Sequence, residues 1–307
     1  MSKVSRHPLG FREIQPRPTK EELAAYYERQ YFQQARGSYE LTYGPAERSW
    51  IEAKGRVRVT VVERALASAL TPSGSCRRAV LDVGCGEGFG LEAFRVAGWT
   101  IRGLDHSVAG VRAQNPHLEP FLVAGDIVDS IGAELAFGRR YDCITLINVL
   151  EHVLDPVGLM ESLHGLLLPG GVFVVTVPND FSELQTLARD EGHTNREYWV
   201  APPDHLQYFN RDSLRSTSAA TGWAVVDMLG DFPIEWMLFH PGSNYLTNPS
   251  AGKPAHRARY TLELGALAGD PSDAIMFQRG LAAVGMCRNI TAVLVPQEQA
   301  GARRAAE

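Results

Sequence analysis

The chain has 307 residues, of which 45% are hydrophobic and 21% charged, and its formal net charge is −5 at pH 7. This composition is typical of a globular protein, and the length suits one large domain or two small ones. A net negative charge gives no electrostatic reason to expect a nucleic acid partner.

The cysteines and the first residues bear on the cellular compartment. The four cysteines, at positions 76, 85, 143 and 287, lie far apart and form no CxxC pair. Their spacing predicts neither a zinc site nor a disulfide framework. The opening MSKVSRHPLGF contains no apolar signal core, and no run approaches the roughly 20 apolar residues of a membrane span. We therefore expect a cytoplasmic protein without a membrane-spanning segment.

Residues 1–75 are expected to form an arm and a helical cap. Three prolines in residues 1–20 predict an extended arm, whereas 20–35 and 50–70 have the composition of helices. The sequence TPSGS at 71–75 indicates a linker or turn.

A regular alternation of strand-like and helix-length segments follows, in a domain predicted over 76–300. Strands are predicted at 79–83, 99–104, 121–124, 141–147 and 171–177, and helices at 88–97, 107–114, 130–137 and 155–168. This order predicts an α/β fold, a doubly wound and mostly parallel sheet covered by helices on both faces.

The alternation stops after Val177, and the remaining elements are less regular. Residues 178–209 are expected to be irregular, and a helix is predicted at 211–221 with strands at 223–229 and 284–295. The segment 231–283 is too long for a turn, so it is predicted to be an insertion with its own structure. The tail at 301–307 is expected to be disordered.

The residues at the predicted carboxyl ends of the strands indicate a ligand-binding site. In an open parallel sheet, ligands bind outside the carboxyl ends of the strands, where Asp82, Asp105, Asp126 and the segment 148–152 fall. The glycine turn after Asp82 departs from the dinucleotide pattern GxGxxG, because its third position is Phe89. Carboxylates would also repel a pyrophosphate. A ligand with cationic groups and sugar hydroxyls, such as S-adenosylmethionine, fits this rim better.

Several motifs resemble those of class I S-adenosylmethionine-dependent methyltransferases. VLDVGCGEG resembles their motif I, and GLDHS, GDI, NVLEHV and LLPGGVFVVTVPN resemble the later motifs in order and spacing. DHLQYFNRDSLRSTSAATGW resembles the segment that follows in the ubiquinone-biosynthesis O-methyltransferase-like branch. The resemblance covers about residues 77–230. It implies a Rossmann-like seven-stranded sheet, with S-adenosylmethionine as cofactor and S-adenosylhomocysteine as product.

The resemblance also implies roles for the strand-end residues. Asp82 would favour the ligand's ammonium through the turn and water, and Asp105 would accept both ribose hydroxyls in charge-assisted hydrogen bonds. Asp126 and the Ile127 amide would contact the adenine. The expected cofactor-binding residues are Asp82, Gly84, Cys85, Gly86, Gly88, Asp105, His106, Asp126, Ile127, Asn148 and Leu150, the last pair at the methionine end.

Each acidic residue has a structural alternative. Asp82 would cap the glycine turn, Asp105 would be the N-cap of the following helix, and Asp126 would be a turn residue.

The expected catalytic group is His205, in PPDHLQYF after the fifth strand. Methyl transfer to a hydroxyl needs a positioned base, and histidine has a free pKa of about 6.5. The alternative is that His205 and Phe209 anchor the loop against the core, and His152 is also expected to be structural. No metal is expected, because only Glu151 supplies a carboxylate after the fourth strand.

The sequence thus predicts an O-methyltransferase for a hydroxyl of a small molecule or glycan. A phenol or quinol precursor and an amine are the other acceptors considered. A non-catalytic S-adenosylmethionine-binding protein and a nicotinamide-dependent reductase are the alternatives from other classes. Tyr198, Trp199 and Tyr208 are candidates for the acceptor pocket or the core. Residues 231–283 are expected to cover the acceptor side or to form a homodimer contact.

Overall fold

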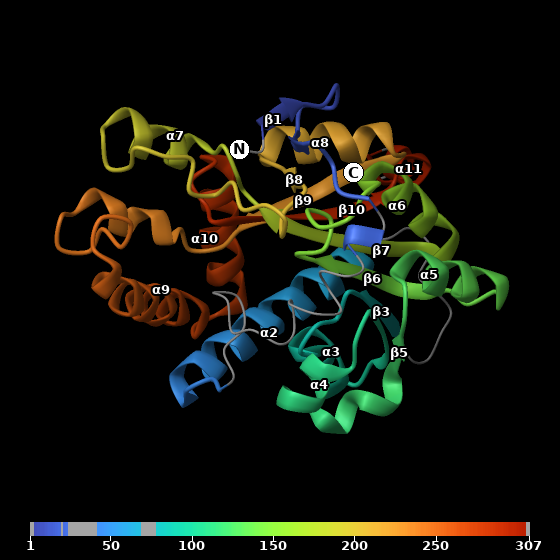
Figure 1. Ribbon diagram of the computed structural model, residues 1–307. Helices are drawn as coiled ribbons and strands as arrows, with labels where there is room; N and C mark the ends of the chain where they lie inside the picture. Colours follow the sequence, from blue (N-terminus) through green and yellow to red (C-terminus); the bar gives the residue numbers. More distant parts are fainter. Residues whose placement is uncertain (1–2, 20, 24–41, 69–77, 305–307) are drawn as a thin grey trace.

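The computed structural model describes residues 3–19, 21–23, 42–68 and 78–304 (Figure 1). It confirms the predicted α/β fold, with seven strands in its main sheet. These strands are β3 (Ala79–Val83), β4 (Thr100–Asp105), β5 (Leu122–Ala124), β6 (Tyr141–Ile147), β7 (Leu167–Pro178), β9 (Trp223–Gly230) and β10 (Asn289–Pro296). The last strand begins later than predicted, because Gly285 turns the chain with a φ of 70° before it.

The order of strands in the main sheet is β5-β4-β3-β6-β7-β10-β9. The strands from β5 to β7 pair in parallel, whereas β10 runs antiparallel to both β7 and β9. One edge of the sheet therefore holds the carboxyl ends of the parallel strands together with the start of β10. This edge positions both halves of the site described below.

Helices cover both faces of the sheet, as predicted (Figure 1). In β7, Val172 and Val174 pack into one hydrophobic cluster and Phe173 and Val175 into another, which is the two-residue period of a strand buried on both sides. The first cluster includes residues of α2 (Pro45–Ala67), α3 (Phe89–Val96) and α4 (Ala109–Gln114). The second includes residues of α5 (Ile127–Ala136), α6 (Pro156–Ser162) and α8 (Arg211–Ala220).

The first residues form a hairpin rather than the expected arm. Strands β1 (Lys3–Arg6) and β2 (Arg12–Gln15) pair antiparallel, and β2 pairs with β8 (Gln207–Tyr208) to make a second sheet. Gly10 supports the turn with a φ of 95°, and Phe11 packs on Phe209 with ring centroids 4.8 Å apart. Burial of Phe11 fixes the hairpin against the main core.

The helix predicted at 50–70 is α2, and it is part of the core. Val57, Val61 and Val62 of α2 belong to the hydrophobic cluster that contains the strands, so the boundary at 75 does not separate two packing units. Most of the helix predicted at 20–35 and the linker at 71–75 lie outside the described residues.

The insertion is helical, and so are two segments expected to be irregular. The segment 231–283 holds η4 (Ile234–Phe239), η5 (Pro249–Ala251), α9 (Gly252–Leu267) and α10 (Pro271–Ala283). Helix α9 packs on α2, where Glu263 accepts hydrogen bonds from Trp50 Nε1 at 2.7 Å and from the Phe232 amide at 2.9 Å. The other helices are α7 (Glu183–Asp190), within 178–209, and α11 (Gln297–Arg304), in the expected disordered tail.

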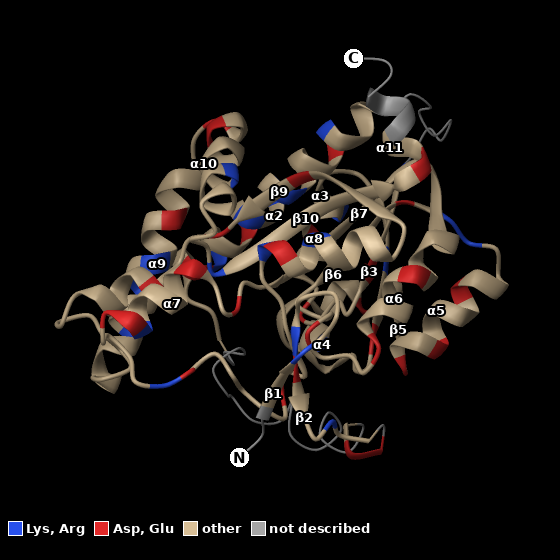
Figure 2. Cartoon of the chain, turned by 90° about the horizontal axis from the view of Figure 1, so that it is seen from above, with Lys and Arg blue, Asp and Glu red and all other residues tan. Residues whose placement is uncertain are grey.

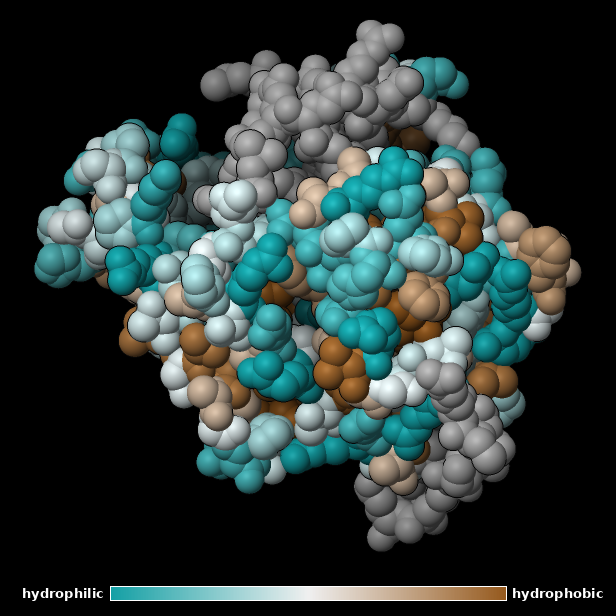
Figure 3. Space-filling view, turned by 90° about the horizontal axis from the view of Figure 1, so that it is seen from below, coloured by the Kyte–Doolittle hydropathy of each residue, from teal (hydrophilic) through white to brown (hydrophobic). Residues whose placement is uncertain are grey.

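The surface carries mixed charge and hydropathy. Both α9 and α10 carry basic and acidic side chains (Figure 2), and hydrophobic residues are interspersed with hydrophilic ones on the face drawn in Figure 3. Within the described ranges, no helix combines the length and apolar character that crossing a membrane requires.

Candidate active site

The turn after β3 requires its glycines. Gly84, Gly86 and Gly88 have φ values of 73°, 54° and 81°, in the left-handed region that favours glycine. A Cβ on Gly84 would lie only 2.3 Å from Cγ2 of Val149. The left-handed backbone, and at Gly84 also the packing of Val149, therefore require glycine, and the expected role of this turn in holding the cofactor stays a prediction.

Asp105, at the end of β4, accepts hydrogen bonds from two turns, the glycine turn after β3 and the turn that follows β4. Its Oδ2 accepts a hydrogen bond from the Gly86 amide at 2.8 Å, and its Oδ1 accepts one from the Ser107 amide at 3.1 Å. Each carboxylate oxygen has a second lone pair, so the group fits two ribose hydroxyls. The N-cap alternative is wrong, because α4 has Val108 as its N-cap and no side-chain cap. The neighbouring His106 is exposed.

Asp82 lies beneath the turn, on the face of β3 that packs against α2. It is 4% exposed and its Oδ1 accepts a hydrogen bond from Thr145 Oγ1 at 2.7 Å. Burial raises its pKa to about 6, although the Thr145 hydroxyl and the Arg58 guanidinium oppose this shift. Its influence on a ligand would pass through the turn, and this role stays a prediction.

Asp126 is the N-cap of α5. Its Oδ1 accepts hydrogen bonds from the amides of Val128 at 2.9 Å and Asp129 at 3.1 Å. This geometry matches the structural alternative for Asp126. Its contact with adenine, and that of the Ile127 amide, stays a prediction.

The other expected cofactor residues differ in accessibility. Asn148 is exposed and has a φ of 53°, at the turn that follows β6. Leu150 has no exposed surface and belongs to the core cluster, so it does not line an open site. Cys85 is buried, and its sulfur lies so close to Gly103 that a Cβ on Gly103 would be 2.8 Å from it.

Two histidines and a glutamate meet at the carboxyl end of β6. The rings of His152 and His205 are in edge-to-face contact with centroids 4.9 Å apart, and the ligand atoms of Glu151, His152 and His205 lie within 4.8 Å of one another. These donor types suit a divalent metal such as Zn²⁺. No metal was expected from the sequence because only Glu151 supplies a carboxylate after this strand. His205 comes from a distant loop, so its position beside Glu151 and His152 was not foreseen.

Burial sets the protonation states in this group. It lowers the pKa of His205 well below its usual value, with smaller contributions from His152 and Arg288. Burial also raises the pKa of Glu151 well above its usual range. At neutral pH the His205 imidazole is therefore uncharged, as a general base must be, and burial disfavours the ionised form of Glu151.

The backbone of the His205 loop is held by its neighbours. The Tyr208 hydroxyl donates to the His205 carbonyl at 3.0 Å, and the Leu206 amide donates to the Glu151 carbonyl at 2.8 Å. Phe209 is fully buried, as the anchoring alternative expects. The His205 ring lies against His152 and its Nε2 is 4.0 Å from Oδ2 of Asp204, so the ring also contributes to the packing of this loop, and its role as a base stays a prediction.

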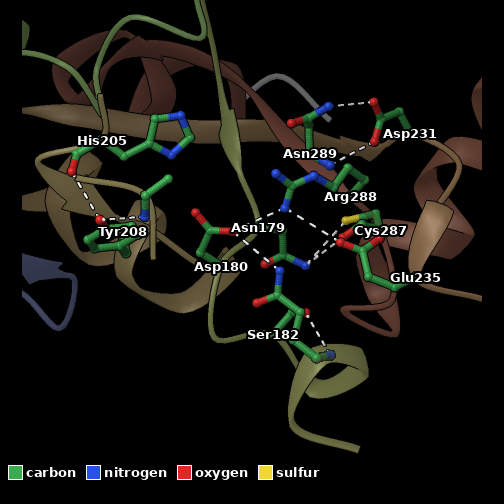
Figure 4. Close-up of polar contacts among 12 residues, drawn as sticks. Asn179, Asp180, Ser182, His205, Tyr208, Asp231, Glu235, Cys287, Arg288 and Asn289 are labelled. Atoms are coloured by element: carbon green, nitrogen blue, oxygen red, sulfur yellow. Dashed lines mark hydrogen bonds and ion pairs between the residues drawn. The ribbon is translucent and has the colours of Figure 1, made fainter. Parts of the chain in front are cut away.

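A third group, absent from the sequence analysis, surrounds Arg288 (Figure 4). Arg288 directly precedes β10, and its Nη1 lies 3.1 Å from Oδ1 of Asp180 and 3.5 Å from Oε1 of Glu235. Asp180 follows β7, and Glu235 belongs to η4 of the insertion. Burial raises the pKa of Asp180 to about 6, against the opposing effect of Arg288. Arg288 was not expected from the sequence, because it precedes an antiparallel strand and the candidate residues all lie at the carboxyl ends of strands or after them.

The sheet order, with an antiparallel strand between β7 and β9, and the glycine turn beside Asp105 define the class I methyltransferase fold. Residues 51–228 match the family model described as a methyltransferase domain, which is more than half of the chain. The chain therefore belongs to the methyltransferase domain family, and S-adenosylmethionine is the cofactor of this class.

Curated relatives match part of the chain. It is 35% identical over 106 residues to a ubiquinone biosynthesis O-methyltransferase of Actinobacillus pleuropneumoniae serotype 5b, covering 33% of this chain and 45% of the relative. It is 31% identical over 159 residues to a probable S-adenosylmethionine-dependent methyltransferase of Mycolicibacterium smegmatis, covering 50% and 55%. The matches span about half the length of these relatives. A solved methyltransferase structure from Archaeoglobus fulgidus aligns with a TM-score of 0.48, 14% identity and coverage of 80% and 93%.

Proposed function

We propose that this protein is an S-adenosylmethionine-dependent O-methyltransferase that methylates a hydroxyl of a small molecule or glycan. The observation that carries the proposal is the placement of two groups on one sheet edge. The glycine turn and Asp105 follow β3 and β4, and Glu151, His152 and His205 gather beyond β6, the strand next to β3.

The cofactor, when bound, supplies a methyl group activated by a positively charged sulfur. Asp105 would hold the ribose, and the Cβ-free turn would let the backbone approach the ligand closely. His205 would accept the proton of the acceptor hydroxyl as the new oxygen–carbon bond forms and the sulfur–carbon bond breaks. This step requires the reacting atoms to be held about 3–3.5 Å apart. S-adenosylhomocysteine and the methyl ether are then the products.

We also propose that the segment before α2 covers the cofactor side of the site. Tyr43, just before α2, donates a hydrogen bond from its hydroxyl to Oε2 of Glu87 at 2.8 Å. The Tyr43 ring meets Phe89 edge-on, with centroids 5.5 Å apart. Both partners belong to the glycine turn or the start of α3, so this contact supports the expected covering role.

The acceptor alternatives remain a phenol or quinol precursor and an amine. The curated relatives named ubiquinone biosynthesis O-methyltransferases favour a precursor of ubiquinone among these. A non-catalytic S-adenosylmethionine-binding protein is the alternative from another class. The first motif of such a protein would be expected to lose some of its residues, whereas the glycine turn and Asp105 are intact here.

Calorimetry with S-adenosylmethionine, S-adenosylhomocysteine and NAD tests the cofactor. We expect the first two to bind and NAD to give no heat of binding. An acceptor screen with methyl-labelled cofactor then tests transfer. Binding of NAD alone would overturn the proposed function, and cofactor binding without transfer to any acceptor would favour the non-catalytic alternative.

A further inference from the structure

Buried polar atoms without hydrogen-bond partners lie beside Arg288, as they also do at Glu151 and His205. Among the described residues, Oδ2 of Asp180, Oε2 of Glu235 and Oε1 of Gln185, a neighbour of Asp180, lack partners and have almost no exposed surface. Burying such atoms unsatisfied is costly, so native proteins pair nearly all of them. Their concentration at one place indicates a group that is satisfied by something outside the chain.

The geometry around Arg288 leaves two carboxylates incompletely neutralised. A single nitrogen, Nη1, contacts both Asp180 and Glu235, so each carboxylate keeps one oxygen without a partner. The two carboxylates and Tyr198 and Tyr245 raise the pKa of Arg288, which therefore stays charged. Two carboxylates facing one guanidinium give the group an excess of hydrogen-bond acceptors and of negative charge when both are ionised.

This group lies beside the proposed base. Asp180 follows β7 and Arg288 precedes β10, and these strands pair next to β6, whose end carries Glu151. Arg288 is close enough to His205 to lower the pKa of that imidazole. The Arg288 and His205 side chains are 24% and 17% exposed, whereas those of Asp180 and Glu235 are 1% and 3% exposed, so a ligand would reach the two carboxylates past Arg288. Figure 4 shows the Arg288 guanidinium between the carboxylates, with the His205 ring across from it.

We propose that Asp180, Glu235 and Arg288, the acceptor triad, bind a sugar-like acceptor through its hydroxyls; this rests on the proposed methyltransferase function. Hydroxyls donate hydrogen bonds to the unpartnered carboxylate oxygens and accept them from Arg288, so neighbouring hydroxyls match both kinds of partner. Tyr198, which is partly exposed and close enough to affect the pKa of Arg288, offers aromatic surface for a sugar ring. A prenyl chain would leave these oxygens buried and unpaired, and an anionic group would be repelled by the two carboxylates.

The test compares two acceptor classes with the purified full chain and tritiated-methyl S-adenosylmethionine. One set of probes is methyl glycosides of common hexoses and deoxyhexoses, together with hexose disaccharides. The other set is catechol and a prenylated catechol. We expect label in members of the sugar set and none in the catechols. Label in a catechol, or label in neither set, overturns the assignment of a sugar acceptor.

A shape-conserving variant tests the triad itself. Glu235→Gln keeps the side-chain volume but replaces a carboxylate oxygen by an amide nitrogen, so it removes acceptor capacity. We expect the KM for the methylated sugar to rise at least tenfold, while the Kd for S-adenosylmethionine and the thermal midpoint stay near those of the parent. If Glu235 is only structural, the thermal midpoint and the cofactor affinity will fall as the sugar KM rises, and that result overturns the proposal.

The matched control is Asp227→Asn. Asp227 of β9 pairs with Arg279 of α10 at 2.7 Å, which is an ion pair of the same type that takes no part in the triad. Its loss should leave the sugar KM unchanged. Calorimetry with S-adenosylmethionine separates the two levels of the proposal: absent binding refutes the proposed function, whereas normal binding with label in catechol refutes the sugar assignment alone.

Discussion

Asp105 has two tasks at the residue scale, because the carboxylate expected to hold the ribose also bonds to the amides of Gly86 and Ser107. We predict that Asp105→Ala weakens S-adenosylmethionine binding at least tenfold, since charged hydrogen bonds contribute roughly 1.5–3 kcal/mol each. It should also lower the thermal midpoint, because two amides lose their acceptor. Calorimetry and thermal unfolding measure the two effects, and unchanged affinity would leave Asp105 with a structural role only.

The His205 imidazole controls the predicted pH dependence of turnover. Its pKa lies well below the usual value, so the uncharged form persists as the pH falls below about 6.5. We predict that the acid limb of the kcat profile is displaced below this range. His205→Asn should cut kcat by about 10²–10⁴-fold while the cofactor Kd changes only a few-fold. The kcat of both proteins from pH 5 to 9 checks this.

Two results would contradict the role of His205 as a base. The first is an acid limb that is the same in the parent and in His205→Asn. The second is loss of turnover on treatment with a chelator and its recovery with Zn²⁺ or Mg²⁺. That outcome would make His205 a metal ligand together with Glu151 and His152, whose donor atoms already lie close to it.

At the scale of elements, Glu263 joins the insertion to the core. It accepts hydrogen bonds from Trp50 of α2 and from the Phe232 amide, and Lys54 and Arg259 lie close enough to stabilise its charge. We predict that Glu263→Ala lowers the free energy of unfolding by about 1–3 kcal/mol, because it leaves the buried Trp50 and Phe232 donors without their acceptor. Urea unfolding measures this loss.

The control for the insertion is Lys253→Ala, at an exposed position of the same helix α9. A surface change of this kind should alter the free energy of unfolding by no more than about 0.5 kcal/mol. A similar small effect for Glu263→Ala would mean that α9 and α2 are not held together by this carboxylate.

The elements differ in how well the sequence predicts them. The strands β3, β6 and β7 are buried on both faces, so their continuous apolar runs between turn signals mark them clearly. The hairpin β1–β2 depends on pairing with Gln207 and Tyr208, a contact between distant parts of the chain that local patterns do not encode. The helices of the insertion likewise owe their packing to α2.

The residues of the candidate site also differ in how well the sequence predicts them. The glycine turn and Asp105 follow parallel strands within motifs of fixed spacing, so the sequence predicted where they meet. Arg288 precedes an antiparallel strand, and Glu235 comes from the insertion, so no spacing rule brings them to Asp180. Only the topology of the sheet does so.

At the scale of the whole molecule, buried carboxylates make the stability depend on pH. Burial raises the pKa of Asp180 from 3.8 to about 6, so between these values the folded state binds more protons than the unfolded state. The contribution of this group to stability is therefore fully present below pH 4 and is lost as the pH rises through 6.

A variant isolates this effect. We predict that Asp180→Asn gains stability relative to the parent as the pH rises from 4 to 7, by an amount on the order of 3 kcal/mol from the size of the shift. The buried His152 and His205, whose pKa values are lowered, titrate in both proteins. Their contributions to the unfolding free energy therefore cancel when the variant is compared with the parent. Urea unfolding at several pH values measures it, and parallel curves would show that burial does not penalise the Asp180 charge.

The hairpin at the start of the chain imposes an order on biosynthesis. Glu13 pairs with Gln207, so strand β2 has only β1 as a partner until most of the chain has left the ribosome. The pairing of β3 with β4, which flanks the glycine turn, joins neighbouring segments and can form early. The loop that carries His205 lies next to the late pairing of β2 with β8. The part of the sheet edge proposed to hold the acceptor is therefore completed after the part proposed to hold the cofactor.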